Sequence, residues 1–295
     1  EYNNQQERYF LVAVDAAGLK RLEKLGFRTV VDASETANFA RLSVPLDQQA
    51  EPVGIESIPG YTCYRTVEET YAAAQALVTA HPTLAAWTDV GNSWTKQQGS
   101  GGYDMMVLKL TNSAITGVKP KIFITASIHA REYTPAETAT RFAEYLVNNY
   151  GTDADATWLL DHHEVHLMFQ ANPDGRKKAE TGLSWRKNVD NNDGCSNSST
   201  WGTDLNRNFS FYWNYCSGCS SADPCADTYR GPSAGSEPET QAIQNYLLSN
   251  FPDQRDASLS AAAPATATGV YIDLHSYSQL VLWPWGFTSS TAPNA

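Results

Sequence analysis

Short apolar segments of strand length alternate with amphipathic segments of helix length along most of this chain. In the helical segments apolar residues recur every three or four positions, and three of them follow the capping pattern Ser/Thr-x-x-Glu. This alternation is typical of an α/β fold, in which helices cover a central sheet. The predicted strands of the main domain are residues 103–110, 121–127, 164–170, 270–274 and 280–283. The predicted capping boxes are residues 66–69, 134–137 and 236–239.

The first 56 residues are predicted to be a separate N-terminal unit with a linker, and residues 57–295 the main domain. Within residues 1–44 the pattern predicts a small β-α-β unit, with strands at 9–14 and 28–31 and a helix between them that stops at Gly26. The linker, residues 45–60, is rich in Pro and Gly. Residues 1–56 are either a pro-segment of a zymogen, or its remnant, or a permanent packing element.

The cysteines lie mainly in a long irregular stretch, residues 171–235, and a loop of that length is usually functional. Cys63 lies outside it, and the other four are Cys195, Cys216, Cys219 and Cys225. The Cys216-x-x-Cys219 pair could be a redox or zinc motif, but no second pair at comparable spacing accompanies it. We therefore expect disulfides that staple the loop of an exported protein. Five cysteines is an odd number, so one thiol is free or pairs outside this chain.

Charge and hydropathy argue against two kinds of partner. The formal net charge is −11, and binding to nucleic acid requires clustered Lys and Arg against the phosphates. No apolar run approaches the length of a membrane span. Together with the expected disulfides, these properties predict a secreted, extracellular protein.

Two predicted strands end in side chains that could bind a metal ion. Strand 121–127 leads into His129 and Glu132, and strand 270–274 leads directly into His275. Open α/β sheets hold their ligands at the carboxyl ends of strands. Each residue alone could equally be a solvated turn residue or a hydrogen-bonded histidine. Two histidines and one glutamate together form a ligand set of catalytic zinc, in which the fourth position is left for water.

Two other groups of candidate ligands are interpreted as structural. Residues 162–166, His-His-Glu-Val-His, lie at the start of a predicted strand with no cap or turn motif, and we expect ordinary strand and edge residues there. The acidic, Asn-rich residues 190–193 could bind calcium, but a solvated loop is the simpler interpretation.

Six motifs occur in an order that resembles the pancreatic-type (carboxypeptidase A/B-like) zinc metallocarboxypeptidases. They are His129-Ala-Arg-Glu132, Asn172-Pro-Asp-Gly175, Trp185-Arg-Lys187, Asp204-Leu-Asn-Arg-Asn208, Thr228-Tyr-Arg-Gly231 and His275-Ser-Tyr-Ser-Gln279. The resemblance extends from about Tyr64 to Phe287 and is to secreted, bacterial-type members. It implies a mixed central sheet flanked by helices and one Zn²⁺ ion. It also implies that the substrates are peptide or protein C-termini, from which a zinc-activated water releases the last residue.

The resemblance also implies roles for individual residues near the metal ion. His129, Glu132 and His275 match the zinc ligands, and Asp204 matches a residue that orients a zinc-bound histidine. Arg186 matches the arginine that polarises the scissile carbonyl and stabilises the oxyanion. A fixed positive charge is suited to that step because negative charge develops there.

Further matching residues would bind the substrate. Asn206 and Arg207 match the pair that holds the terminal carboxylate, and the planar guanidinium can bind a carboxylate through two hydrogen bonds. This contact is what makes a peptidase an exopeptidase. The residues that match the lining of the neighbouring subsite are Arg131, Ser276 and Tyr277.

The family's pattern continues beyond the last residue of this sequence. Its general-base glutamate, its mobile substrate-covering tyrosine and the residue at the base of its specificity pocket all follow the His-Ser-Tyr motif, and none can be assigned here. We therefore expect a fragment, whose remaining part is either missing from the sequence or a separate polypeptide. Two alternatives remain: a catalytically impaired protein that binds peptide C-termini, and a zinc amidase or deacylase on the same fold. The complete Asn206–Arg207 pair favours a carboxypeptidase over the amidase.

Overall fold

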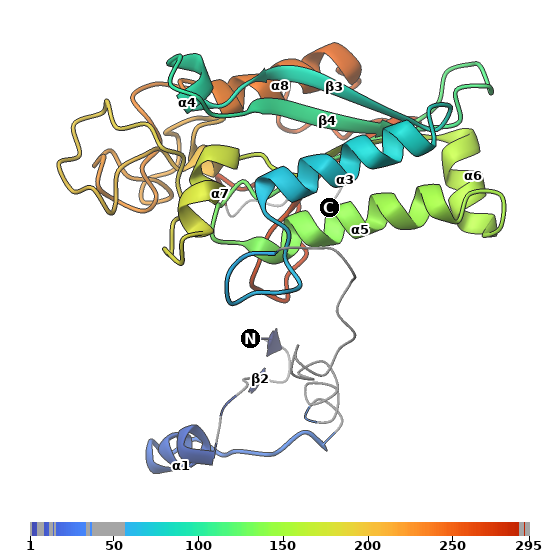
Figure 1. The fold of residues 1–295 in the computed structure, drawn as a ribbon. Helices are drawn as coiled ribbons and strands as arrows, with labels where there is room; N and C mark the ends of the chain where they lie inside the picture. Colours follow the sequence, from blue (N-terminus) through green and yellow to red (C-terminus); the bar gives the residue numbers. More distant parts are fainter. Residues whose placement is uncertain are drawn as a thin grey trace. The chain divides into compact units, whose positions relative to one another are not determined.

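The computed structural model describes residues 2–4, 9–11, 14, 16–33, 36, 57–288 and 292. The chain divides into two compact units, Glu1–Gly54 with Tyr277–Val281, and Ile55–Ser276 with Leu282–Ala295. The larger unit contains the central sheet and its helices (Figure 1). No helix among the described residues is long and apolar enough to cross a membrane. Most of the predicted linker at 45–60 lies outside the described residues, so the boundary after residue 56 stays a prediction.

The smaller unit departs from the predicted β-α-β order. Its described elements are β1 (Tyr2–Asn4), β2 (Tyr9–Leu11) and α1 (Ala16–Lys24), and β1 pairs with β2 in antiparallel orientation. The predicted helix and its stop are confirmed, since Gly26 has a φ of +89°. The strand predicted at 28–31 is wrong, because these residues form no regular element and Val30 is exposed. A β-branched run forms a strand only against a partner strand and a covered face.

The central sheet of the larger unit is mixed, as the resemblance implied. Its five strands lie in the order β3 (Ala85–Asn92), β4 (Asp104–Leu110), β6 (Glu164–Met168), β5 (Lys121–Ala126) and β7 (Gly269–Leu274). Strand β4 is antiparallel to β3 and β6, whereas β5 is parallel to β6 and β7. The sequence pattern predicts all of these strands except β3, whose apolar and polar residues barely alternate. The strand predicted at 280–283 is wrong, because these residues form no strand and their large apolar side chains are exposed.

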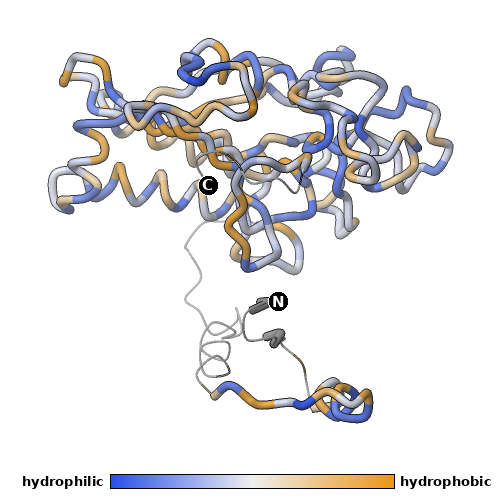
Figure 2. Tube along the Cα trace, turned by 180° about the vertical axis from the view of Figure 1, so that it is seen from behind, coloured by the Kyte–Doolittle hydropathy of each residue, from blue (hydrophilic) through white to orange (hydrophobic). Residues whose placement is uncertain are grey.

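Alternate side chains of β4 enter two separate hydrophobic cores, as the pleat of a strand requires. The helices of this unit are α3 (Val67–Ala80), α4 (Trp94–Gln97), α5 (Tyr133–Asn148), α6 (Ala154–His162), α7 (Pro173–Ala179) and α8 (Pro238–Asn250). Leu108 and Leu110 of β4 pack into a core with α3, α5 and α6. Met105 and Val107 of the same strand pack into a core with α8. Thus α3 and α5 cover one face of the sheet and α8 the other (Figure 1). The hydrophobic residues are concentrated along these strands (Figure 2).

The three predicted capping boxes have different outcomes. The box at the start of α3 is confirmed, since Thr66 and Glu69 each accept a hydrogen bond from the other's backbone N–H. The boxes predicted at 134–137 and 236–239 are wrong, because α5 and α8 begin without a side-chain cap. Their glutamates serve tertiary contacts instead. Glu137 pairs with two arginines, and Glu239 accepts a hydrogen bond from the backbone N–H of Trp94.

The long stretch 171–235 is irregular, as predicted, except for α7 and the 3₁₀ turn η2 (Leu205–Arg207). Two disulfides staple it, Cys195–Cys225 and Cys216–Cys219, and the thiol of Cys63 is unpaired. Disulfides and one unpaired thiol agree with the prediction from the cysteine count. The pattern missed α7 even though a helix-capping asparagine and an N-terminal proline mark its start.

The histidine-rich segment 162–166 is structural, as predicted. His162 is the last residue of α6, and His166 is buried in β6. The Nδ1 atom of His166 lies 2.5 Å from the hydroxyl of Tyr246, and its Nε2 atom lies 3.1 Å from a carboxylate oxygen of Glu164. Both ring nitrogens are thus engaged within the core beside α8.

Candidate metal centre and carboxylate-binding residues

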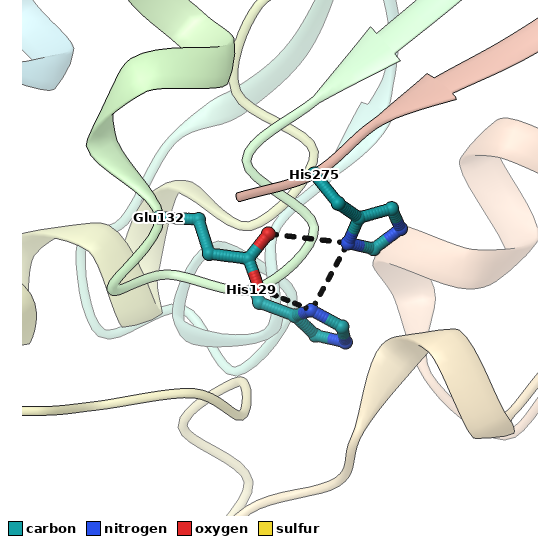
Figure 3. A group of neighbouring side chains, drawn as sticks. All are labelled: His129, Glu132 and His275. Carbon is teal, nitrogen blue, oxygen red and sulfur yellow. Dashed lines mark hydrogen bonds and ion pairs between the residues drawn. The ribbon is translucent and has the colours of Figure 1, made fainter. Parts of the chain in front are cut away.

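Two neighbouring parallel strands bring the predicted metal ligands together. In the register of β5 and β7, Ala126 pairs with Leu274. The turn that follows β5 carries His129 and Glu132, and the residue after β7 is His275. Because parallel strands end at the same edge of a sheet, three residues that are distant in sequence meet there. Figure 3 shows their side chains pointing toward one another.

The donor atoms of these three side chains converge on one point. His129 Nδ1 lies 2.8 Å from Glu132 Oε1, and His275 Nδ1 lies 3.1 Å from Glu132 Oε2. The two Nδ1 atoms are themselves only 3.2 Å apart. One ligand atom from each residue lies within 4.8 Å of the others, and His129 and Glu132 are buried. Two imidazole nitrogens and a carboxylate in this arrangement match the three protein ligands of a catalytic zinc site, in which water takes the fourth position.

The charges of these groups depend on one another. Burial opposes the ionisation of Glu132, but hydrogen bonds from His129, His275 and the backbone N–H of Ser276 outweigh it and lower its pKa to about 2. Burial also opposes the charging of His275, but its contacts with Asp273 and Glu132 raise its pKa to about 10. The carboxylate is therefore ionised at neutral pH and attracts positive charge, whether a proton or a metal ion.

A buried arginine that the sequence did not single out holds the metal-binding turn. The side chain of Arg176, on α7, donates hydrogen bonds to the carbonyl oxygen of Glu132 (3.2 Å) and to the hydroxyl of Ser127 (3.4 Å). Another of its nitrogens donates to the carbonyl oxygen of Arg65 (3.3 Å), and its guanidinium lies over the ring of Tyr133. Ser127 has a φ of +57°, a conformation that costs energy in a non-glycine residue. Arg176 thus stabilises a strained turn from inside the protein.

Asn172 links the metal-binding turn to the segment that carries Arg186. Its side-chain amide donates to the carbonyl oxygens of Ile128 (3.2 Å) and Lys187 (3.0 Å), and its side-chain oxygen accepts a hydrogen bond from Gly175 N. A Cβ atom on Gly175 would lie 2.4 Å from the Lys187 carbonyl oxygen. The Asn-Pro-Asp-Gly motif therefore holds two loops of the site together.

Asp204 connects several predicted site residues. Its Oδ2 atom accepts hydrogen bonds from Arg186 Nε (3.1 Å) and Nη2 (2.8 Å), and its Oδ1 atom lies 3.3 Å from His129 Nε2. Burial opposes its ionisation, but the contacts with His129 and Arg186 outweigh it and lower its pKa. Asp204 also caps η2 by accepting a hydrogen bond from Asn206 N. One ionised carboxylate thus orients a candidate metal ligand, an arginine and the turn that follows.

The turn η2 brings the predicted carboxylate-binding pair to the metal centre. Asn206 Nδ2 lies 3.3 Å from Nε2 of His275. Arg207 donates from Nε to the carbonyl oxygen of Cys219 (2.8 Å) and from Nη1 to the carbonyl oxygen of Asn206 (2.9 Å). No Asp or Glu of the described residues forms an ion pair with Arg207. Its positive charge therefore stays available for a ligand.

The three residues predicted to line the neighbouring subsite lie in different settings. Arg131 Nη1 lies 3.4 Å from the hydroxyl of Ser184 and 3.7 Å from a carboxylate oxygen of Asp227. The backbone N–H of Ser276 donates to Glu132, so Ser276 contacts the metal-binding group directly. Tyr277 is 98% exposed and lies in the segment that groups with the smaller unit.

The acidic segment 190–193 is only in part the solvated loop that the sequence predicted. Asp190 is buried, and it lies with Asp193 and the buried Glu237 in a second group of closely spaced carboxylates. Burial, together with the neighbouring acids, raises the pKa of Glu237. The short polar sequence around residues 190–193 gave no sign of this group, because Glu237 comes from the start of α8, more than forty residues further along the chain.

Comparison with known proteins assigns the chain to a family. The sequence profile of the family described as zinc carboxypeptidase matches residues 70–295. Carboxypeptidase A1 of Rattus norvegicus is 31% identical over 247 residues, which are 83% of this chain and 52% of that protein. Carboxypeptidase B of Astacus astacus is 34% identical over 233 residues, 78% of this chain and 66% of that protein. The chain belongs to the zinc carboxypeptidase family.

A solved structure gives the same assignment for the fold. Thrombin activatable fibrinolysis inhibitor (TAFI) superposes with a TM-score of 0.64 at 27% identity, covering 78% of this chain and 51% of that one. The chain thus spans about half the length of several of the proteins it matches. Family membership implies a single catalytic Zn²⁺ ion, and the converging donors of His129, Glu132 and His275 fit such an ion.

Proposed function

We propose that this chain carries the zinc site and the carboxylate-binding site of a carboxypeptidase that hydrolyses the C-terminal peptide bond of peptides and proteins. The observation that carries the proposal is the proximity of two kinds of site. The converging donors of His129, Glu132 and His275 lie beside Asn206, and Arg207 adjoins it with an unpaired charge. A metal centre alone would suit many hydrolases, whereas a nearby cation without a carboxylate partner selects substrates that end in a carboxylate.

Arg207 would bind the terminal carboxylate of the substrate, and Asn206 would donate a further hydrogen bond to it. Holding the carboxylate fixes the last peptide bond at one distance from the metal centre. Positioning of this kind is worth several kcal/mol of the barrier, because the reacting groups are already oriented when the reaction begins. The same contact would exclude internal peptide bonds, since no carboxylate lies one residue beyond them.

Arg186 would stabilise the negative charge that develops on the oxygen of the scissile carbonyl. Its Nε and Nη2 atoms are bound to Asp204, which fixes the plane of the guanidinium and leaves Nη1 without a partner among the described residues. A preorganised donor of this kind typically contributes a factor of about 10²–10³ to the rate. When bound, zinc would polarise the carbonyl and lower the pKa of a water molecule. Arg131, Ser276 and Tyr277 would contact the residue before the cleaved bond.

Two features support export of the protein. The disulfides Cys195–Cys225 and Cys216–Cys219 persist in an oxidising compartment and are rare in the cytosol. An extracellular peptidase would also encounter the free peptide ends that this site fits. Residues 1–56 would be either a pro-segment or a permanent part of the protein, which N-terminal sequencing of the secreted protein distinguishes.

The test is release of the terminal amino acid from a set of peptides, each paired with its C-terminal amide, by the zinc-loaded chain. We expect chelator-sensitive release of single residues from the free acids only, and no release by Glu132→Gln. Equal cleavage of acids and amides would contradict the carboxypeptidase and favour an amidase. Stoichiometric zinc with tight peptide binding but no release would favour a protein that binds C-termini without turnover.

A further inference from the structure

A disulfide-closed turn contacts the arginine that would hold the substrate carboxylate. The four residues Cys216-Ser-Gly-Cys219 form a turn in which Cys219 N donates to the carbonyl oxygen of Cys216 (3.3 Å). Gly218 has a φ of +83°, as the third residue of such a turn often requires. The disulfide joins the first and last residues of the turn. The carbonyl oxygen of Cys219, at its end, accepts the 2.8 Å hydrogen bond from Arg207 Nε.

This contact determines which nitrogen of the Arg207 guanidinium is left without a partner. Arg207 Nε and Nη1 are both bound to carbonyl oxygens, of Cys219 and of Asn206, whereas Nη2 has no partner among the described residues. The two carbonyls accept hydrogen bonds but carry no net charge, so they orient the group without neutralising it. Arg186 differs, because it is held by an ion pair with the carboxylate of Asp204 rather than by carbonyl oxygens.

The far side of the turn is linked through backbone hydrogen bonds to Asp204. Ser221 N donates to the carbonyl oxygen of Thr228, and the carbonyl oxygen of Tyr229 accepts a hydrogen bond from Asp204 N. The turn therefore lies between two fixed points, Arg207 on one side and the strand-like pair of Ser221 and Tyr229 on the other. The disulfide removes the remaining freedom of the four residues in between.

We propose that the Cys216–Cys219 disulfide is a positioning element for substrate binding: it fixes the Cys219 carbonyl oxygen so that Arg207 presents Nη2, its nitrogen without a partner among the described residues, to the C-terminal carboxylate. The proposal rests on the proposed function, because it assigns the disulfide a part in the same recognition step. An unconstrained turn would let the side chain of Arg207, which has several rotatable bonds, explore other directions. Loss of the disulfide would therefore lower the affinity for the substrate carboxylate and leave the metal centre unchanged.

The test compares binding of an N-acetylated dipeptide with its C-terminal amide by titration calorimetry, on the zinc-loaded full chain. In C216S/C219S we expect affinity for the free acid to fall by roughly tenfold, the effect of one hydrogen bond to a charged group, with affinity for the amide and zinc content unchanged. In turnover, KM for free acids should rise while kcat changes little. The matched control is C195S/C225S, which removes the other disulfide of the same stretch and should leave the acid-to-amide ratio as in the wild type.

A double-mutant cycle with Arg207→Met gives a second measurement that does not depend on the stability of one variant. In the Arg207→Met background, removing Cys216 and Cys219 should have no further effect on the acid-to-amide ratio. Equal ratios in C216S/C219S and the wild type, or an additive effect in the cycle, would overturn the proposal. A wild-type chain that does not prefer the acid would overturn the proposed function itself and this inference with it. A preference lost only in the variants supports both.

Discussion

Replacing Arg176 with methionine should destabilise the protein and weaken metal binding together. Arg176 is the largest fully buried side chain of the described structure. Burial lowers its pKa to about 10, which still leaves it charged at neutral pH. Methionine would fill a similar volume but donate no hydrogen bond. The carbonyl oxygen of Arg65 would lose its side-chain donor, and that of Glu132 would keep only the hydrogen bond from the Ser127 hydroxyl (3.3 Å).

The size of the effect follows from these contacts. A buried hydrogen bond to a charged group contributes about 1.5–3 kcal/mol, and removing one member of a buried charged network typically costs about 3–5 kcal/mol. Arg176 also has an ion-pair contact with Glu180 at 3.8 Å, although Glu180 keeps a second partner in Lys177. We therefore expect Arg176→Met to lower the free energy of unfolding by roughly 3–5 kcal/mol. Because the residue holds the turn that carries Glu132, zinc affinity should fall by about 10–100-fold.

The assays are denaturant unfolding of the metal-free protein and competitive titration with a zinc-binding dye. Arg141→Met is the matched control, since Arg141 is half exposed and pairs with Glu137 one helical turn away. Glu137 is buried but keeps Arg65 as a second partner, so we expect a loss of at most about 1 kcal/mol in this control. A loss below 1 kcal/mol in Arg176→Met would refute the argument from buried hydrogen bonds. Lower stability with unchanged zinc affinity would refute the link to the metal-binding turn.

Three further predictions follow from single sites. His275→Ala should retain less than one equivalent of zinc after dialysis, measured by atomic absorption, and the chelator should then no longer shift its unfolding temperature; a full equivalent would remove His275 from the ligand set. Gly175→Ala should cost about 1–3 kcal/mol in chemical unfolding, because its Cβ would meet the Lys187 carbonyl oxygen, whereas Gly286→Ala, where a Cβ meets nothing within 4 Å, should be neutral. Burial raises the pKa of Glu239 from 4.5 to about 8, so the folded state holds a proton that the unfolded chain releases. The free energy of unfolding should therefore fall as pH rises across that window, and Glu239→Gln should reduce the slope.

The parts of the fold that sequence patterns predict well are those fixed by local interactions. The apolar segments that become β4, β5, β6 and β7 were recognisable because each combines the length of a strand with a run of apolar residues. The capping box of α3 was recognisable because both of its hydrogen bonds are made within four residues. The boxes expected at α5 and α8 failed because distant partners bind the same side chains, as Trp94 binds Glu239. Tertiary contacts override a local signal whenever they offer a better partner.

The residues of the candidate site were likewise predictable from sequence only in part. His129 and Glu132 were recognisable by their place after a strand, but their proximity to His275 depends on β5 and β7 being neighbours, which only the sheet order establishes. Arg176 gave no signal, because a buried arginine looks in sequence like any exposed one. The local pattern could not predict that these residues lie together. The family resemblance could, because its motifs combine residues that are more than a hundred positions apart in sequence but close in the fold.

Asp204 explains why the site works as one unit rather than as a set of separate motifs. Its carboxylate contacts His129 and Arg186 at the same time and caps the turn that carries Asn206 and Arg207. A shift of this single side chain would disturb a candidate metal ligand, the arginine proposed to face the scissile carbonyl and the proposed carboxylate-binding pair together. Effects of substitutions among these residues should therefore not be additive, because each residue relies on the same buried charge. The geometry of the candidate site would then depend less on any one ligand than on the aspartate that joins them.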